Sequence, residues 1–119
     1  MVYQADALKE RTKQFALRIV RLFRSLPRTE EARVIGKQLL RSGTSVAANY
    51  RAVCRARSKP EFVAKIGVVV EETDETVFWL ELLVDSRIVP AAKLDGLLAE
   101  ANELLAIFAA SQRTARSRQ

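Results

Sequence analysis

The stretch QLLRSGTSVAANYRAVCRARSKPE, residues 38–61, decides the fold of this 119-residue chain. On a wheel of 3.6 residues per turn, its apolar and small residues fall on one side and its basic residues on the other. The basic side, extended upstream, consists of Arg33, Lys37, Arg41, Arg51 and Arg55. We therefore expect one long helix that buries one face and presents a stripe of cations on the other.

Gly43 lies inside this helix, although glycine costs about 1 kcal/mol relative to alanine in a helix interior. The apolar periodicity continues on both sides of it, so we expect packing against another helix to hold the segment helical, with or without a bend. A close approach by a neighbouring backbone would explain the missing side chain.

Three further amphipathic segments complete the chain. The first is expected at about residues 6–26, where Pro27 ends it, and the third at about residues 59–87. The fourth begins near residue 90 and fades at residue 111. Short connections between four such helices predict an all-α fold, an antiparallel up-down-up-down four-helix bundle.

Two helix starts carry recognisable capping signals. Thr29 is expected to cap the second helix, and Ser58-Lys59-Pro60-Glu61 matches a capping box at the start of the third. We place a single domain at residues 1–110 and expect residues 111–119 to form a basic, mobile tail.

The composition argues against an enzyme. The chain contains no histidine, which removes imidazole catalysis and histidine metal ligands, and it has no glycine-rich phosphate loop. Cys54 is the only cysteine, so we expect no internal disulfide and a reducing, cytoplasmic location. We see no signal peptide and no membrane-spanning run. We expect no catalytic residue, no metal, no cofactor and no membrane partner.

The net charge of +6 conceals two oppositely charged halves. Residues 9–65 carry fifteen Lys or Arg against four Asp or Glu, whereas residues 66–105 carry two against nine. The basic half could bind nucleic acid, or the two halves could attract each other between copies of the chain. Charge alone leaves both interpretations open.

The cations of the stripe have few acids in register to neutralise them, which favours an external anion over a merely solvated surface. The candidate nucleic-acid-binding residues are Arg33, Lys37, Arg41, Arg51, Arg55 and Arg57. Such contacts to phosphate carry no sequence preference and weaken steeply with salt. Aromatic residues for base stacking are scarce here, and Tyr50 is expected to point inward. The pattern favours structured RNA or a duplex over a single strand.

Apolar side chains are also expected on the outer sides of the first and third helices, where a solvated helix does not need them. We predict that these surfaces meet head-to-tail between copies, so that the chain forms a homo-oligomer. The candidate interface residues are Leu17, Arg18, Val20 and Arg21 on the first helix, and Glu75, Phe78, Trp79 and Leu82 on the third.

A polar seam borders the apolar face of the second helix. It consists of Ser42, Ser45, Asn49 and Tyr50. An unpaired buried polar group costs about 1–3 kcal/mol, so these groups must find partners. We interpret the seam as a structural network that sets the register between helices, and a ligand site is the alternative.

Three motifs together resemble a known family: SVAANY at residues 45–50, RARS at residues 55–58 and EETDETVFWLE at residues 71–81. The chain resembles the bacterial four-helix-bundle proteins encoded in intervening sequences of 23S ribosomal RNA genes. It is also similar to the accessory protein of diversity-generating retroelements. The resemblance implies a ring-like homopentamer, contact with nucleic acid and a reverse transcriptase or another protein as partner, and it brings no established catalytic residues.

We therefore expect a non-enzymatic, oligomeric four-helix-bundle protein that binds nucleic acid, RNA or a structured duplex, through a basic surface. The alternative is a protein-interaction scaffold or accessory subunit whose basic and acidic faces serve self-assembly.

Overall fold

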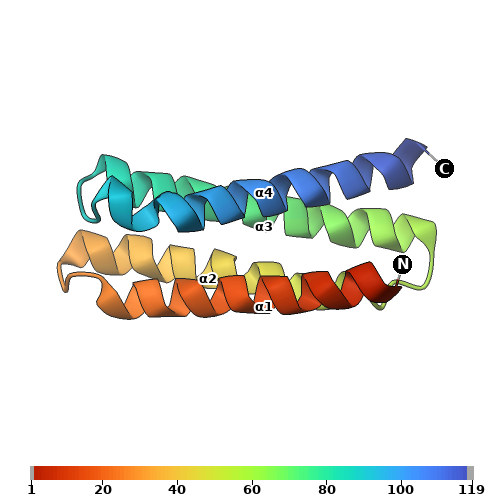
Figure 1. The fold of residues 1–119 in the computed structure, drawn as a ribbon, viewed down its shortest axis with the longest axis horizontal. Coiled ribbons are helices and arrows are strands. Elements are labelled where there is room, and N and C mark those ends of the chain that lie inside the picture. The colour runs from red at the N-terminus through yellow and green to blue at the C-terminus, as the bar shows by residue number, and fades with distance from the viewer. Residues whose placement is uncertain (1, 118–119) are drawn as a thin grey trace.

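The computed structural model describes residues 2–117, which form four helices: α1 (Val2–Ser25), α2 (Glu30–Val53), α3 (Lys59–Asp85) and α4 (Ala91–Ser117). Consecutive helices run in opposite directions along a bundle of 47 × 22 × 22 Å (Figure 1). α2 packs on α1 and α3, α3 packs on α4, and α4 returns to α1 through a looser contact. Within the described residues α1 does not contact α3, so these two helices occupy opposite corners. The predicted all-α, up-down-up-down bundle is confirmed.

The predicted capping residues begin α2 and α3. The Thr29 hydroxyl accepts a hydrogen bond from the backbone N–H of Ala32 at 3.3 Å, and the Ser58 hydroxyl accepts one from the N–H of Glu61 at 3.2 Å. The Glu61 carboxylate in turn accepts the backbone N–H of Arg57. Side chains thus satisfy amide groups that the first turn of a helix leaves without partners.

Helix ends that lack such signals differ from the prediction. α1 begins at Val2 rather than near residue 6, and α2 ends at Val53, before the basic run that follows it. The predicted end of the last helix at residue 111 is wrong, because α4 continues to Ser117. No glycine or proline interrupts residues 111–117, and the Gln112 side chain lies against Gly67 of α3. Residues 118–119 of the expected tail lie outside the described residues.

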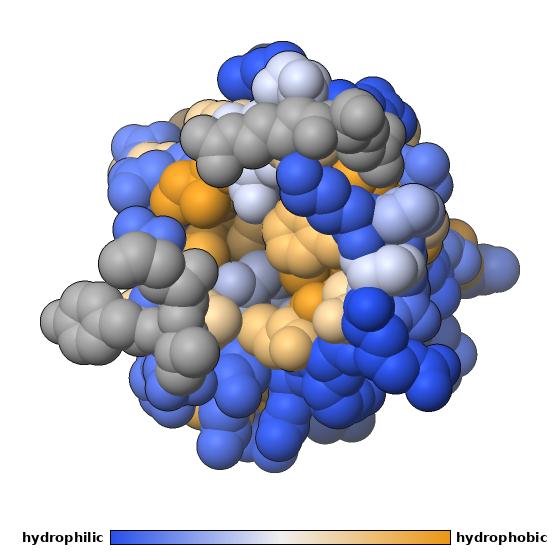
Figure 2. Space-filling model, turned by 90° about the vertical axis from the view of Figure 1, so that its right-hand side faces the viewer, coloured by the Kyte–Doolittle hydropathy of each residue, from blue (hydrophilic) through white to orange (hydrophobic). Residues whose placement is uncertain are grey.

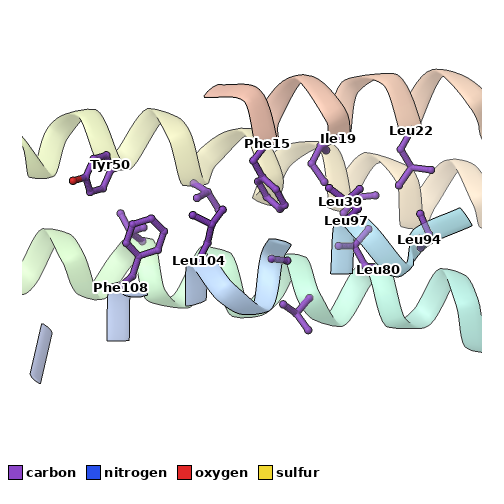
Figure 3. Packing of buried hydrophobic residues seen from close by; sticks show 14 of the residues in the cluster. Phe15, Ile19, Leu22, Leu39, Tyr50, Leu80, Leu94, Leu97, Leu104 and Phe108 are labelled. Carbon is purple, nitrogen blue, oxygen red and sulfur yellow. The ribbon is translucent and has the colours of Figure 1, made fainter. Parts of the chain in front are cut away.

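The core is a row of apolar side chains along the bundle axis. Seen from the end where α2 connects to α3, hydrophobic residues lie in a central hollow and hydrophilic residues surround them (Figure 2). All four helices contribute to the row, which includes Phe15, Ile19, Leu39, Tyr50, Leu80, Leu104 and Phe108 (Figure 3). Within residues 2–117, every helix falls short of the length or apolar character that a membrane span requires.

Gly43 faces α1 at a point that has no room for a side chain. A Cβ atom added at Gly43 would lie 2.8 Å from Cγ1 and 2.9 Å from Cγ2 of Ile19. Two turns earlier, a Cβ atom at Gly36 would lie 2.8 Å from Cδ1 of Leu26. The neighbour that excludes a side chain at Gly43 is therefore the Ile19 side chain, and not a backbone as the sequence suggested.

Replacing Gly43 by alanine tests this packing. Ile19 is fully buried and β-branched, so it cannot move aside, and overpacking typically costs about 1–3 kcal/mol. This exceeds the gain in helix propensity of about 1 kcal/mol. We expect Gly43→Ala to lower the free energy of unfolding by about 1 kcal/mol, measured by urea denaturation.

Gly96→Ala is the matched control. A Cβ atom at Gly96 would approach only the flexible tip of Arg18, at 3.4 Å. We expect this variant to gain up to about 1 kcal/mol of stability. A Gly43→Ala protein that gains as much as the control would contradict the packing described above.

Candidate nucleic-acid interface

The outer face of α2 carries three of the predicted cations in the expected arrangement, and a fourth, Arg55, lies in the turn that follows α2. Arg33, Lys37, Arg51 and Arg55 are all exposed. None of the four takes part in an ion pair within residues 2–117. Arg57, which follows α2 in the turn before α3, is exposed as well. These side chains are free to meet an external anion.

Two grooves between α1 and α2 add cations from α1 to this face. We call the first the Arg33 cluster, which consists of Arg24, Arg28, Arg33 and Lys37 beside the α1–α2 connection. We call the second the Arg51 cluster, which consists of Lys9, Lys13, Arg51 and Arg55 near the start of α1. The antiparallel packing of the two helices brings each set together from distant parts of the sequence.

The two clusters differ in their acids. No acidic residue lines the groove of the Arg33 cluster, whose other residues are apolar. Asp6 and Glu10 line the groove of the Arg51 cluster, and the Asp6 carboxylate lies 3.5 Å from Nζ of Lys9. The Arg33 cluster is therefore the stronger concentration of positive charge.

Arg41 does not belong with the free cations. Its Nη1 donates to both carboxylate oxygens of Glu72 at 3.3 Å, and its Nη2 donates to the carboxylate of Glu75. The hydrogen bond to Glu75 raises the pKa of Arg41 above its ordinary value. The hydrogen bond from Trp79 Nε1 and the charge of Arg41 lower the pKa of Glu75. The prediction that the stripe lacks acidic partners is wrong at Arg41, because these partners lie on α3.

A second ion-pair cluster joins α1 to α4. Arg11 donates through Nε and Nη2 to the two carboxylate oxygens of Glu100 at 2.8 and 2.7 Å, and through Nη2 to Glu103 at 2.8 Å. These bonds lower the pKa of Glu100, and the charge of Arg18 lowers it further. The guanidinium of Arg18 lies beside Gly96 of α4. Arg18, a predicted interface residue, thus faces a helix of its own chain.

The predicted interface residues of α3 form an apolar patch among acids. Phe78 is 52% exposed, and its ring meets the edge of the Trp79 ring with centroids 4.9 Å apart. Trp79 and Leu82 are half-buried, and the Trp79 ring also packs against the core. Trp79 Nε1 donates to Glu75 at 3.1 Å, which fixes the indole ring. Phe78 is therefore the apolar side chain of this patch that is most exposed to solvent.

The other predicted surface lies on α1, at the opposite corner of the bundle. Leu17 is 37% exposed, Val20 is half-buried and Arg21 is exposed. The two patches face away from each other, since α1 and α3 make no contact within the described residues. Two different patches that face away from each other can form a head-to-tail contact between copies.

The predicted polar seam divides into separate contacts. The Ser42 hydroxyl accepts a hydrogen bond from the Thr76 hydroxyl at 3.0 Å and so links α2 to α3. Asn49 Nδ2 donates to the backbone oxygen and the hydroxyl of Ser45 within α2. The Tyr50 ring lies in the core. Within the described residues, Ser42 forms the hydrogen bond of the seam that joins two helices, and the Tyr50 ring packs against Phe108 of α4 with centroids 5.4 Å apart.

The hollow visible in Figure 2 lies beyond Tyr50 at the end of the bundle. Leu8, Val53 and Phe62 contribute apolar lining, and the turn after α2 closes one side. The Tyr50 hydroxyl points away from the core row toward this end (Figure 3), and burial raises its pKa. No buried side-chain polar atom of the described residues lacks a partner, which favours the structural role of the seam over a ligand site.

The sequence pattern of α2 alone does not identify four further cations of this face, Lys9, Lys13, Arg24 and Arg28. Lys13 and Arg24 lie on the outward side of the α1 wheel and are exposed. Pairing α1 with α2 as a helical hairpin about Pro27 would have placed them beside the stripe. The short connection between α1 and α2, combined with the wheel positions of both helices, would therefore have predicted that the α1 cations lie beside those of α2.

Comparison with known proteins gives a family and a structural relative. A family model described as 23S rRNA-intervening sequence protein matches residues 7–110. The chain is also similar to a crystal structure of a protein from Bacteroides thetaiotaomicron VPI-5482, described as having unknown function and coming from the S23 ribosomal protein family. The two chains share 30% identity and a TM-score of 0.84, over 92% of this chain and 97% of the other. Curated proteins give no match. The predicted resemblance to the 23S rRNA intervening-sequence proteins is confirmed.

The Arg11–Glu100 pair predicts a pH-dependent stability. The lowered pKa of Glu100 means that the pair stabilises the fold above the ordinary value of 4.5 and loses this effect as the pH falls through the folded-state value. We expect Arg11→Gln to cost about 1 kcal/mol at about pH 7, and the difference from the wild type to shrink below about pH 4.

Urea denaturation at a series of pH values measures this difference. Arg113→Gln, which removes an exposed arginine of α4 that forms no ion pair within residues 2–117, is the control and should change stability little at any pH. A stability loss in Arg11→Gln that stays the same from neutral to acidic pH would contradict the role of Glu100.

Proposed function

Because the chain belongs to the 23S rRNA-intervening sequence protein family, we propose that it is a non-enzymatic protein that binds nucleic acid, with RNA as its principal target. The contact surface is the face that α1 and α2 share. The family is named for intervening sequences of 23S rRNA and this name assigns no activity, so the charges of the surface are what support binding.

One observation carries this proposal. Arg33, Lys37, Arg51 and Arg55 are exposed and form no ion pair within the described part of the chain, whereas Arg11 and Arg41 bind carboxylates of neighbouring helices. A folded chain that only needed solubility would gain from mixed charges on this face. A concentration of unneutralised cations favours phosphate, which releases bound counterions when it is neutralised.

We also propose that the chain assembles with itself in a ring. The exposed Phe78 patch of α3 and the Leu17 side of α1 lie on opposite corners, and the acids near Phe78 complement the cations near Leu17. A contact between two different patches generates a closed ring when its rotation allows closure. The pentamer implied by the family resemblance is one such ring.

The second candidate function is that of a protein-interaction scaffold or accessory subunit. The exposure of Phe78 favours it, because an exposed aromatic ring beside half-buried Trp79 and Leu82 is typical of a protein contact. In this case the partner of α3 is another protein, such as a reverse transcriptase, and the cations of α2 serve assembly alone.

Charge reversal separates the two candidate functions. We expect Arg33→Glu/Lys37→Glu to weaken binding to RNA by at least about 10-fold at low salt, because each lost phosphate contact reduces the slope of log K against log salt by about 0.7–0.9. Fluorescence anisotropy with labelled RNA at several salt concentrations measures both quantities.

Arg113→Glu/Arg116→Glu on α4 is the matched control, since it makes the same change of charge on another helix. An equal loss of affinity in the control would contradict the assignment to α1 and α2. No binding of the wild type to RNA or duplex DNA at low salt would contradict the proposed function itself.

Phe78→Glu tests the assembly surface. A carboxylate at this position would be buried without a partner in the interface, so we expect the protein to become monomeric in light scattering. Val34→Glu is the control, because Val34 is 59% exposed on α2, outside both patches. Retention of the wild-type mass in Phe78→Glu would contradict the assignment of the α3 patch.

A further inference from the structure

The cations on the α1–α2 face fall into two groups with an uncharged region between them. From Lys37 to Arg51, α2 has one cation, Arg41, and α3 carboxylates hold it. The remaining surface there consists of small side chains, including Thr44 and Ala48. We call this region of α2 the waist.

The dimensions of the waist follow from helix geometry. At a rise of about 1.5 Å per residue, roughly 21 Å separates Lys37 from Arg51 along α2, and roughly 27 Å separates Arg33 from Arg51. The Arg33 and Arg51 clusters are thus two cationic surfaces at opposite ends of one face, and the stretch of α2 between them carries no cation free of an ion pair within the described residues.

A single strand fits this arrangement poorly. Proteins that bind single strands combine a continuous basic groove with aromatic side chains on which bases stack. Here a strand that crossed the waist would leave several phosphates without cations. The aromatic residue that lines these grooves is Phe23, which is half-buried, and Tyr50 is in the core.

A double helix fits it better. Its phosphates lie on two ridges separated by grooves, and the pattern repeats every 34–36 Å or so in duplex DNA. Two cationic surfaces about 21–27 Å apart can therefore each meet a separate ridge, while an uncharged surface lies beneath the groove between them. Double-stranded RNA is likewise recognised through its shape and its phosphates across successive grooves.

We propose that the α1–α2 face binds the double helix of a nucleic acid, with the Arg33 cluster on one phosphate ridge, the Arg51 cluster on another and the waist beneath the intervening groove. This inference rests on the proposed function, because it names the form of nucleic acid that the same face binds. It recognises the spacing of phosphate ridges and no base sequence.

Fluorescence anisotropy at fixed low salt, with the wild-type protein, tests the choice of ligand. The probes are a 20-base-pair RNA duplex, a DNA duplex of equal length, a 20-nucleotide oligouridine and a 6-base-pair RNA duplex too short to reach both clusters. We expect either long duplex to bind at least about 10-fold more tightly than oligouridine, and the short duplex to bind weakly. The two long duplexes distinguish RNA from DNA as the source of the ridges.

Variants test the two-cluster geometry. Arg33→Glu/Lys37→Glu and Arg51→Glu/Arg55→Glu should each bring the affinity for the long duplex down toward that of the short one. Ala48→Lys adds a cation to the exposed waist. We expect it to strengthen oligouridine binding by several-fold and duplex binding by no more than about 2-fold, because no phosphate ridge lies over the waist.

The outcomes separate this inference from the proposed function. Binding of oligouridine as tight as that of the long duplexes overturns the inference and leaves nucleic-acid binding in place. A gain in duplex affinity from Ala48→Lys equal to the gain for oligouridine also overturns it. Failure of every probe to bind at low salt overturns the proposed function and the inference together.

Discussion

The contact between Ile19 and Gly43 sets the arrangement on which the proposed binding face depends. Because Gly43 presents no side chain, Ile19 packs directly against the α2 surface, and Leu26 does the same at Gly36. Two such contacts, two turns apart, bring this part of α1 close to α2. The grooves in which cations of both helices gather exist only at this separation. The packing of Ile19 and Leu26 against α2 therefore determines how close the cations of α1 lie to those of α2.

The same packing decides which arginines are available. An arginine on an outer helix face can meet a carboxylate of an adjacent helix only if the two residues lie at the same height along the bundle. Arg41 lies on the side of α2 that faces Glu72 and Glu75, and Arg11 lies beside Glu100. The cations of the Arg33 cluster border α1, whose residues lining that groove are basic or apolar. The acidic half of the sequence thus neutralises some cations and leaves others free.

The sequence predicts the bundle well because the fold depends on local signals. Periodicity identifies each buried face, and the side chains of Thr29 and Ser58 mark two helix starts. The helix ends at residues 2 and 117 escaped prediction because no proline or glycine marks them. The end of α3 was predicted to within two residues, although Arg87 rather than glycine takes the left-handed conformation there, with φ of 62°.

The candidate site was harder to predict because it depends on which side chains of adjacent helices lie next to each other. Wheel positions in α2 placed Arg33, Lys37, Arg51 and Arg55 on the surface correctly. They could not show that Arg41 is neutralised across the α2–α3 contact, or that Arg18 faces α4. Both facts depend on which residues stand at the same height on adjacent helices. That register follows from side-chain packing such as the Ile19–Gly43 contact, which helical periodicity does not encode.

Nucleic-acid binding and self-assembly, as proposed above, use different sides of the bundle. The apolar patches lie on α1 and α3, at opposite corners, whereas the free cations lie on α2 and on the side of α1 that borders it. A head-to-tail contact through Phe78 and Leu17 leaves the outer face of α2 uncovered in every copy. Each copy then adds two more cationic clusters to a shared ligand, and the effective concentration of neighbouring copies raises the affinity of the assembly above that of one chain.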